Sequence, residues 1–167
     1  MSESVYLGNP NLKKANVQQQ WTKKQVEEFS LCMQDPIYFI KNYIKIVSLD
    51  EGLVPFDLYD FQKEMVGTFH SNRFTICKLP RQSGKSTTII SYLLHYVLFN
   101  DSVNVAILAN KAATARDLLG RLQLAYEHLP KWLQQGVVIW NKGNIELENG
   151  SKILASATSG SAVRGSS

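Results

Sequence analysis

One stretch decides the fold of this chain: Leu79-Pro80-Arg81-Gln82-Ser83-Gly84-Lys85-Ser86-Thr87. It fits the phosphate-loop pattern GxxxxGK[ST] at every signature position except the first, where Leu79 replaces glycine. In such a loop successive backbone N–H groups, here including those of Gln82 and Ser83, point inward around an anion. Gly84 lets the main chain come close, and the positive end of the following helix faces the anion. The stretch therefore predicts a site for the phosphates of a nucleotide.

The side chains of this stretch each have an expected role in nucleotide chemistry. Lys85 would reach the β- and γ-phosphates, Ser86 would offer a hydroxyl to Mg²⁺, and Thr87 would donate near the other phosphates. Arg81 can face the γ-phosphate and stabilise transition-state charge as an arginine finger in cis. A surface charge or a salt bridge is the alternative role for Arg81. The catalytic candidates are thus Arg81 and Lys85, and the metal candidate is Ser86.

The flanking pattern places the motif between a strand and a helix, which is the context that a phosphate loop requires. Apolar runs and breakers predict a strand at 74–79, a helix at 86–99, a buried parallel strand at 103–109 and a helix at 111–129. This alternation implies an α/β fold with a parallel sheet, helices on both faces and right-handed crossovers. Beyond Trp132, short strands at 137–140, 145–148 and 152–155 are separated by turns such as Asn149-Gly150 and form a β-hairpin excursion.

Gln62 is the candidate for recognising the base. It lies in Leu58-Tyr59-Asp60-Phe61-Gln62, ahead of the phosphate loop. A glutamine amide both donates and accepts, so it can read the adenine edge while a nearby aromatic such as Tyr59 packs on the ring. A solvated glutamine on a helix is the alternative.

A carboxylate to hold the water shell of the metal is missing from the expected place. Ile46-Val47-Ser48-Leu49-Asp50-Glu51 imitates such a Walker B strand, but it precedes the loop and runs into Gly52, so we assign it to a turn. Glu146 and Glu148 flank a predicted hairpin and do not end a long apolar strand. No convincing Walker B acid follows Lys85.

Composition and length bound the remaining possibilities. With 167 residues, 44% of them hydrophobic, the chain can form one domain with a real core. The net charge of +4 and the pI near 9.0 permit a polyanionic partner without demonstrating one. Cys32 and Cys77 do not have metal-ligand spacing, and no stretch is long enough to span a bilayer or reads as a secretory signal, which favours a reducing, intracellular setting. Three regions are expected: a flexible N-terminal tail or a peripheral arm at 1–20, a helical subregion with the base-recognition motif at 21–73, and a phosphate-loop core at 74–167.

Taken together, the motifs resemble those of the large terminase subunit of myovirus-type tailed phages. The resemblance spans nearly the whole chain after the tail and includes the variant Walker A at Leu79–Thr87, in which the first glycine is commonly absent and Arg81 and Gln82 are expected. Further matching blocks are Asp35–Ile40, Phe56–Gln62, Ile107–Lys111, Trp140–Gly143 and Ala162–Gly165, the last of which precedes the Walker B strand in the family.

The resemblance implies an ASCE/RecA-like P-loop NTPase with ATP and Mg²⁺ as cofactors, here truncated before the Walker B strand. It implies ATP-driven translocation of double-stranded DNA into the prohead at the portal vertex in the host cytoplasm. The implied partners are the portal protein, the small terminase subunit, other copies of the chain and a missing C-terminal part of the same protein. A split gene, a split intein junction or a truncation would each produce an end at Ser167.

Two other functions remain open at this point. The same loop could serve a helicase-like remodelling ATPase, or the chain could be a nucleotide-binding module without turnover of its own. The basic residues Lys111, Arg116 and Arg121 recur along one predicted helix, but such runs are usually solvated faces, so no DNA site is assigned to them.

Overall fold

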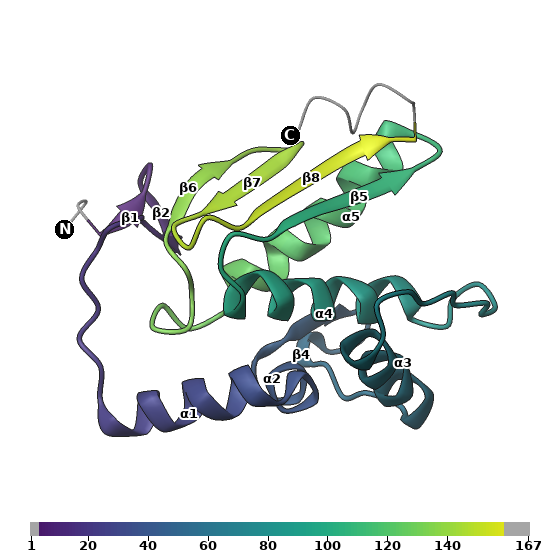
Figure 1. Ribbon diagram of the computed structural model, residues 1–167, viewed down its shortest axis with the longest axis horizontal. Coiled ribbons are helices and arrows are strands. Elements are labelled where there is room, and N and C mark those ends of the chain that lie inside the picture. Colours follow the sequence, from purple (N-terminus) through teal and green to yellow (C-terminus); the bar gives the residue numbers. More distant parts are fainter. Residues whose placement is uncertain (1–3, 159–167) are drawn as a thin grey trace.

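A computed structural model describes residues 4–158 and contains one hydrophobic core. Figure 1 shows the main sheet above a group of helices, with α4 (Lys85–Phe99) between the two. Helix α4 packs on α5 (Ala112–Glu127), α3 (Asp60–Ser71) and α2 (Pro36–Tyr43). Helix α5 packs on the sheet strands β5 (Asn104–Ala109) and β8 (Lys152–Ala157). The largest fully buried side chains include Phe39 of α2, Leu94 of α4, Leu119 of α5 and Ile153 of β8. One continuous core therefore joins the helical subregion to the sheet.

The helices begin where the sequence places capping residues. Thr22 caps the first helix through a reciprocal pair of hydrogen bonds with Gln25, and Asp35 both ends that helix and caps the next, with Pro36 at its first position. None of the helices in residues 4–158 combines the length and apolar character needed to cross a membrane. The helices are α1 (Lys23–Gln34), α2 (Pro36–Tyr43), α3 (Asp60–Ser71), α4 (Lys85–Phe99) and α5 (Ala112–Glu127).

The main sheet has the strand order β5-β8-β7-β6. Only β5 and β8 run parallel; β8 with β7 and β7 with β6 are antiparallel. Its strands are β5 (Asn104–Ala109), β6 (Val137–Trp140), β7 (Asn144–Leu147) and β8 (Lys152–Ala157). The predicted parallel strand at 103–109 is confirmed as β5, but its expected burial is wrong, because only Ile107 of this strand is buried. The three short strands after Trp132 are confirmed, and Asn149-Gly150 forms the β7–β8 turn, with Gly150 at φ 82°.

The expected parallel sheet with helices on both faces is corrected by this topology. Within residues 4–158 the sheet is mixed, and α5 is the helix that covers it. The outer edge of β5 has no partner strand in the same range, and Leu108 on it is 41% exposed. The family block at Ala162–Gly165 lies outside the described residues.

The predicted strand at 74–79 is also wrong for the described part of the chain. Residues 74–80 have no regular secondary structure and pair with no strand of residues 4–158, and the side chains of Phe74 and Ile76 are 81% and 98% exposed. A run of β-favouring residues becomes a strand only when a neighbouring strand supplies hydrogen-bond partners. No described segment supplies them here.

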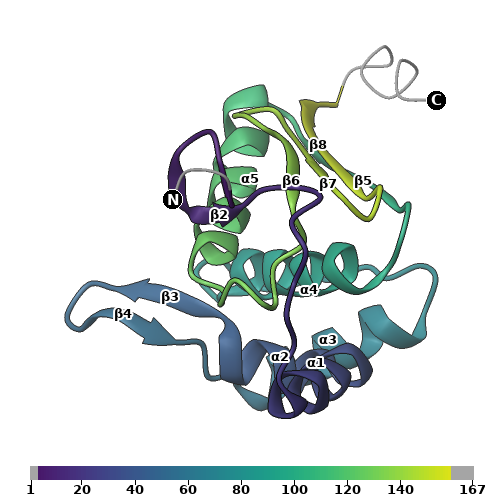
Figure 2. The same cartoon turned by 90° about the vertical axis from the view of Figure 1, so that its left-hand side faces the viewer.

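A two-stranded hairpin carries the stretch that imitates a Walker B strand. It consists of β3 (Lys45–Ser48) and β4 (Gly52–Pro55), paired antiparallel, and Asp50 and Glu51 lie in its turn. Figure 2 shows this hairpin projecting away from the helices. The assignment of Asp50-Glu51 to a turn is therefore confirmed.

Of the two alternatives expected for the N-terminus, a flexible tail or a peripheral arm, residues 5–14 fit the arm. These residues form a small hairpin of β1 (Val5–Tyr6) and β2 (Asn9–Lys13), and Leu12 is buried. The side chain of Gln134 accepts from the backbone N–H of Lys13 at 2.9 Å and donates to the carbonyl of Asn11 at 2.9 Å. Figures 1 and 2 both show the hairpin beside β6. We call residues 5–14 the N-terminal arm.

Replacing Gln134 by Ala should detach the N-terminal arm. The buried amide also donates to the carbonyls of Tyr126 and Leu129, so its loss leaves several buried polar groups unpaired and should cost about 2–3 kcal/mol of unfolding free energy in urea. Amide exchange at Lys13 should accelerate. Gln123→Ala, which removes one exposed hydrogen bond, is the matched control and should change stability by less than about 1 kcal/mol. Unchanged exchange at Lys13 in Gln134→Ala would show that other contacts hold the arm.

His95 on α4 is a buried titratable group inside an aromatic cluster. Its Nε2 lies 2.8 Å from the carbonyl oxygen of Cys32 on α1, and its ring packs against Phe39 and Phe99 at centroid distances of 5.5 Å and 4.8 Å. Burial lowers the pKa of His95 from its ordinary value of 6.5 to about 4. The neutral ring thus joins α1 to α4.

The stability of the fold should fall as the pH decreases from about 6.5 to about 4. Unfolded chains bind a proton at His95 below pH 6.5, whereas the folded chain resists protonation until about pH 4, so the contribution present above 6.5 is lost across this window. The loss should approach about 3 kcal/mol. His95→Phe should flatten this part of the pH profile of urea unfolding, while the control His128→Gln, at a histidine at the end of α5 and outside the aromatic cluster, should leave it in place. A profile with the same slope in His95→Phe would contradict this assignment.

Candidate functional site

The segment 80–84 turns sharply into α4, and Gly84 is the residue that makes the turn. Gly84 is the N-cap of α4 in the left-handed conformation, at φ 73° and ψ 14°, and Gln82 also has a positive φ of 62°. The first turn of α4 contains no acidic residue. The positive end of the helix dipole is therefore not neutralised from within the helix.

Gln62 of α3 holds the turn from the other side. Its Oε1 accepts from the backbone N–H of Tyr59 at 2.9 Å, and its Nε2 donates to the carbonyl of Ser83 at 3.4 Å. Gln62 is only 2% exposed. A Cβ atom at Gly84 would lie 2.7 Å from this Nε2, so a larger residue does not fit without displacing the amide. The start of α3 and the turn are thus joined through one buried side chain.

Two polar groups of the turn have unusual surroundings. The Lys85 ammonium donates to the carbonyl of Leu79 at 3.1 Å, which places it against the segment that precedes the turn. The hydroxyl of Ser83 is buried and has no hydrogen-bond partner among the described residues. Thr88, in contrast, donates its hydroxyl to the carbonyl of Gly84 at 2.9 Å and fixes the first turn of α4.

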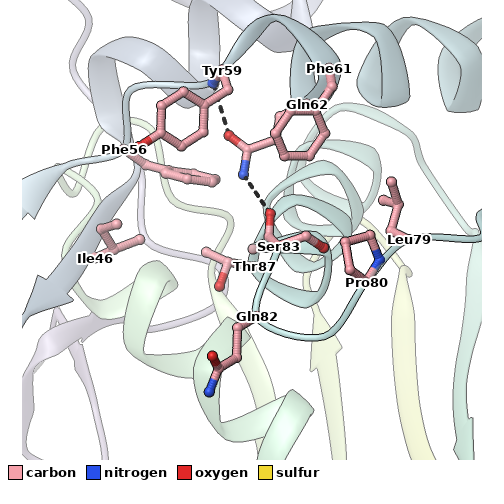
Figure 3. Close-up of a pocket in the computed structure, with 11 residues that line it drawn as sticks. Ile46, Phe56, Tyr59, Phe61, Gln62, Leu79, Pro80, Gln82, Ser83 and Thr87 are labelled. Atoms are coloured by element: carbon pink, nitrogen blue, oxygen red, sulfur yellow. Dashed lines mark hydrogen bonds between the residues drawn. The ribbon is translucent and has the colours of Figure 1, made fainter.

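A cavity of about 630 Å³ opens between the turn, α3 and the base of the β3–β4 hairpin. Figure 3 shows Gln62 between Tyr59 and the turn, with both of its hydrogen bonds. The Tyr59 and Phe61 rings lie nearly parallel at 11°, with centroids 6.1 Å apart, and Tyr59 is 71% exposed. The lining residues are Ile46, Phe56, Tyr59, Phe61, Gln62, Leu79, Pro80, Gln82, Ser83, Gly84 and Thr87.

The structure brings together most of the site residues expected from the sequence. Those that line the cavity are Tyr59, Gln62, Gln82, Ser83, Gly84 and Thr87. Arg81, Lys85 and Ser86 do not line it; Arg81 is exposed and forms no ion pair within residues 4–158. The same range holds no group of three or more His, Cys, Asp or Glu side chains able to bind a metal.

Several residues that line the cavity were not predicted as site residues from the sequence, because they lie far from the loop along the chain. Ile46 and Phe56 come from the two ends of the β3–β4 hairpin, and Phe61 comes from the first turn of α3. The only sequence signal for Phe56 and Phe61 is their place in the block around Gln62. Ile46 carries no such signal, because its place beside the cavity follows from the hairpin, in which it pairs with Val54.

The two carboxylates Glu146 and Glu148 have structural roles away from the cavity. Glu146 lies 3.9 Å from the Lys152 ammonium, and Glu148 accepts from the backbone N–H of Asn16 at 2.8 Å. Their exclusion as metal-site acids is consistent with this placement.

The fold and the site define an α/β protein with a phosphate-loop turn at the start of a central helix and a cavity beside it. The sequence model of the family described as terminase large subunit, T4likevirus-type, N-terminal, matches residues 76–167, which is more than half of the chain. The chain belongs to this family. The resemblance inferred from the motifs is thereby confirmed.

Membership of this family indicates the general function of the protein. A large terminase subunit serves phage DNA packaging, and the complete protein uses ATP. The matched region begins at Ile76, in the irregular segment before the turn, and includes α4, α5 and the sheet.

Replacing Gly84 by Ala should distort the turn. The new Cβ meets the Gln62 amide at 2.7 Å and forces an L residue into a left-handed conformation, which should cost about 1–3 kcal/mol of unfolding free energy. Gly67→Ala in α3 is the matched control: its Cβ meets nothing within 4 Å, so it should stabilise the protein by up to about 1 kcal/mol. Urea denaturation measures both. Equal stability of the Gly84→Ala variant and the parent would mean that the turn does not depend on this conformation.

Proposed function

We propose that this chain is the ATP-binding portion of a terminase that couples ATP hydrolysis to the translocation of double-stranded DNA into the prohead. The observation that carries the proposal is the left-handed turn at Gly84, which opens the N-terminus of α4 beside a cavity that reaches Gln62. Backbone N–H groups and an uncompensated helix dipole favour phosphate groups at this place.

The phosphate end of the nucleotide would lie against the turn. The backbone N–H groups of the first turn of α4 lack intrahelical partners, and the Lys85 ammonium needs only to exchange the Leu79 carbonyl for a phosphate oxygen. The unpartnered hydroxyl of Ser83 would gain a partner when an anion enters. Ser86 would then supply its hydroxyl to Mg²⁺.

The base end would lie between Tyr59 and Gln62. The exposed face of the Tyr59 ring is available for stacking on adenine. The Gln62 amide uses one lone pair for Tyr59 and one N–H for Ser83, so one N–H and one lone pair remain to read the base edge. Gln62 would therefore form hydrogen bonds with the base and with the turn at the same time.

Catalysis would need groups beyond those that line the cavity. No acidic side chain lines it, so the carboxylate that holds the metal's water shell would come from the C-terminal part of the protein. Arg81 is exposed at the mouth of the turn without an ion pair in the described range, and we assign it the role of stabilising charge on the γ-phosphate.

The unpaired segment at 74–79 supports a need for further strands. Its exposed Phe74 and Ile76, together with the open edge of β5, would be covered when additional strands complete the sheet. The proposed setting is an oligomer on the portal vertex in the host cytoplasm, with the portal protein, the small terminase subunit and DNA as partners. Stimulation of the reconstituted protein's ATPase by portal-bearing proheads, rather than by forked DNA or RNA, tests this setting against a helicase-like role.

ATP with Mg²⁺ should raise the thermal stability of the chain. At a concentration of about one hundred times the dissociation constant, linkage adds about 2.7 kcal/mol, which calorimetry or dye fluorescence detects as a higher melting temperature. Lys85→Ala should abolish the shift because the phosphates lose their cation. Lys63→Ala, an equal loss of charge at an exposed position on α3, should retain it.

Arg81→Ala should retain the shift but lower the ATPase rate of the complete protein by roughly a thousandfold or more. A melting temperature that saturating nucleotide leaves unchanged, in a folded parent chain, would overturn the proposal.

A further inference from the structure

A second pocket lies on the side of α1 and α2, formed by residues that do not contribute to the nucleotide cavity. Its volume is about 510 Å³, and its walls include Lys24, Glu28, Tyr38, Tyr43 and Trp132. None of these residues belongs to the phosphate loop or lines the first cavity. What binds here is therefore independent of the proposed function.

The Glu28 carboxylate is held in a fixed orientation by two phenols. The Tyr43 hydroxyl donates to Oε2 at 2.7 Å, and the Tyr38 hydroxyl lies 2.8 Å from Oε1 and 2.9 Å from Oε2. Each phenol has one hydrogen to donate, whereas a carboxylate has about four lone-pair positions. About two acceptor positions thus remain for another donor. The hydrogen bonds from Tyr43 and Tyr38 also hold the pKa of Glu28 below its ordinary value, so the group is ionised at neutral pH.

No cation lies within ion-pair distance of this carboxylate among residues 4–158, although the more distant charge of Lys24 also helps to lower the pKa of Glu28. The ion pairs in that range join Arg121 to Asp117 and Lys152 to Glu146. Lys24 lies one turn before Glu28 on α1 and lines the pocket, but its ammonium is not within ion-pair distance of the carboxylate. Two donated hydrogen bonds orient the charge but do not neutralise it.

Aromatic rings complete the pocket. The Tyr43 and Trp132 rings meet at 88° with centroids 5.7 Å apart, so they form two perpendicular walls. Tyr38 forms a further part of the wall on α2. Faces of tyrosine and tryptophan attract cations through the ring quadrupole, and a carboxylate beside such rings adds a charge-assisted hydrogen bond.

We propose that this pocket binds an organic cation, with Glu28 as the anionic acceptor and Tyr38, Tyr43 and Trp132 as aromatic walls. A guanidinium group fits the chemistry best, because it is planar, stacks on aromatic faces and offers paired N–H donors to the two remaining acceptor positions. Either a free guanidinium compound or an arginine side chain of a polypeptide would present this group. The role of Glu28 in joining α1 to α2 uses only the phenol hydrogen bonds and leaves the pocket available.

Titration of the ¹⁵N-labelled chain with ethylguanidinium, followed by NMR, tests the proposal. The indole N–H of Trp132 and the side-chain amide of Asn42, which also lines the pocket, should shift in a saturable manner with a dissociation constant on the order of millimolar. The indole of Trp140, which packs on Tyr126 at 5.2 Å, should not move and serves as an internal reference. Ethylurea has nearly the same shape without the charge and should produce no saturable shift.

Three variants distinguish the effect of the Glu28 charge on binding from an effect on folding. Glu28→Gln retains an acceptor for both phenols but removes the charge, and binding should weaken at least about tenfold. Glu27→Gln makes the same change at the adjacent exposed carboxylate and should bind within about twofold of the parent. If Glu28→Gln does not fold, Trp132→Leu should weaken binding by about tenfold with Asn42 as the reporter.

A second titration with acetyl-arginine-amide identifies the source of the cation. Binding at least as tight as that of ethylguanidinium assigns the pocket to an arginine side chain, and weaker binding assigns it to a free compound. The proposal is overturned if neither cation shifts Trp132, if ethylurea shifts it equally, or if Glu28→Gln and Glu27→Gln bind alike.

Discussion

The conformation of the chain at Gly84 is the constraint on which the rest of the site depends. The left-handed φ of 73° turns the chain into α4, and the buried Gln62 amide occupies the space where any side chain at this position would lie. These two features together aim the N-terminus of α4 at the cavity.

The surrounding fold serves to hold this turn. Helix α4 is packed on three sides, by α2, α3 and α5, so its N-terminus cannot move without disturbing the core. Gln62 adds a direct connection from α3, and the hairpin that ends at Phe56 brings the base side of the cavity to the same place. The position of the turn is therefore set by long-range packing, while its shape is set by one glycine.

Elements with local causes were predictable from the sequence. The caps at Thr22 and Asp35 and the Asn149-Gly150 turn each depend on neighbouring residues, and the helix at 86–99 begins at Lys85, within one residue of expectation. The motifs also identified Tyr59, Gln62 and Gln82 as candidates, although it is the packing of α3 on α4 and the Gln62–Ser83 hydrogen bond that bring the two blocks to one cavity.

Elements with distant causes were not predictable. The run at 74–79 has strand-forming residues but no partner strand in the described range, so its side chains remain exposed. The N-terminal arm is polar enough to suggest a tail, yet Gln134, far along the chain, supplies the buried hydrogen bonds that fix it. Pairing and burial of this kind depend on residues that no local pattern specifies.

The most direct test of the central claim is an NMR titration of the ¹⁵N-labelled chain with ATP and Mg²⁺, read residue by residue. If the phosphates bind at this turn, the largest chemical-shift changes should occur at the backbone amides of residues 82–88 and at the side-chain amide of Gln62. Shifts confined to other surfaces, with the amides around Gly84 unmoved at saturation, would contradict it.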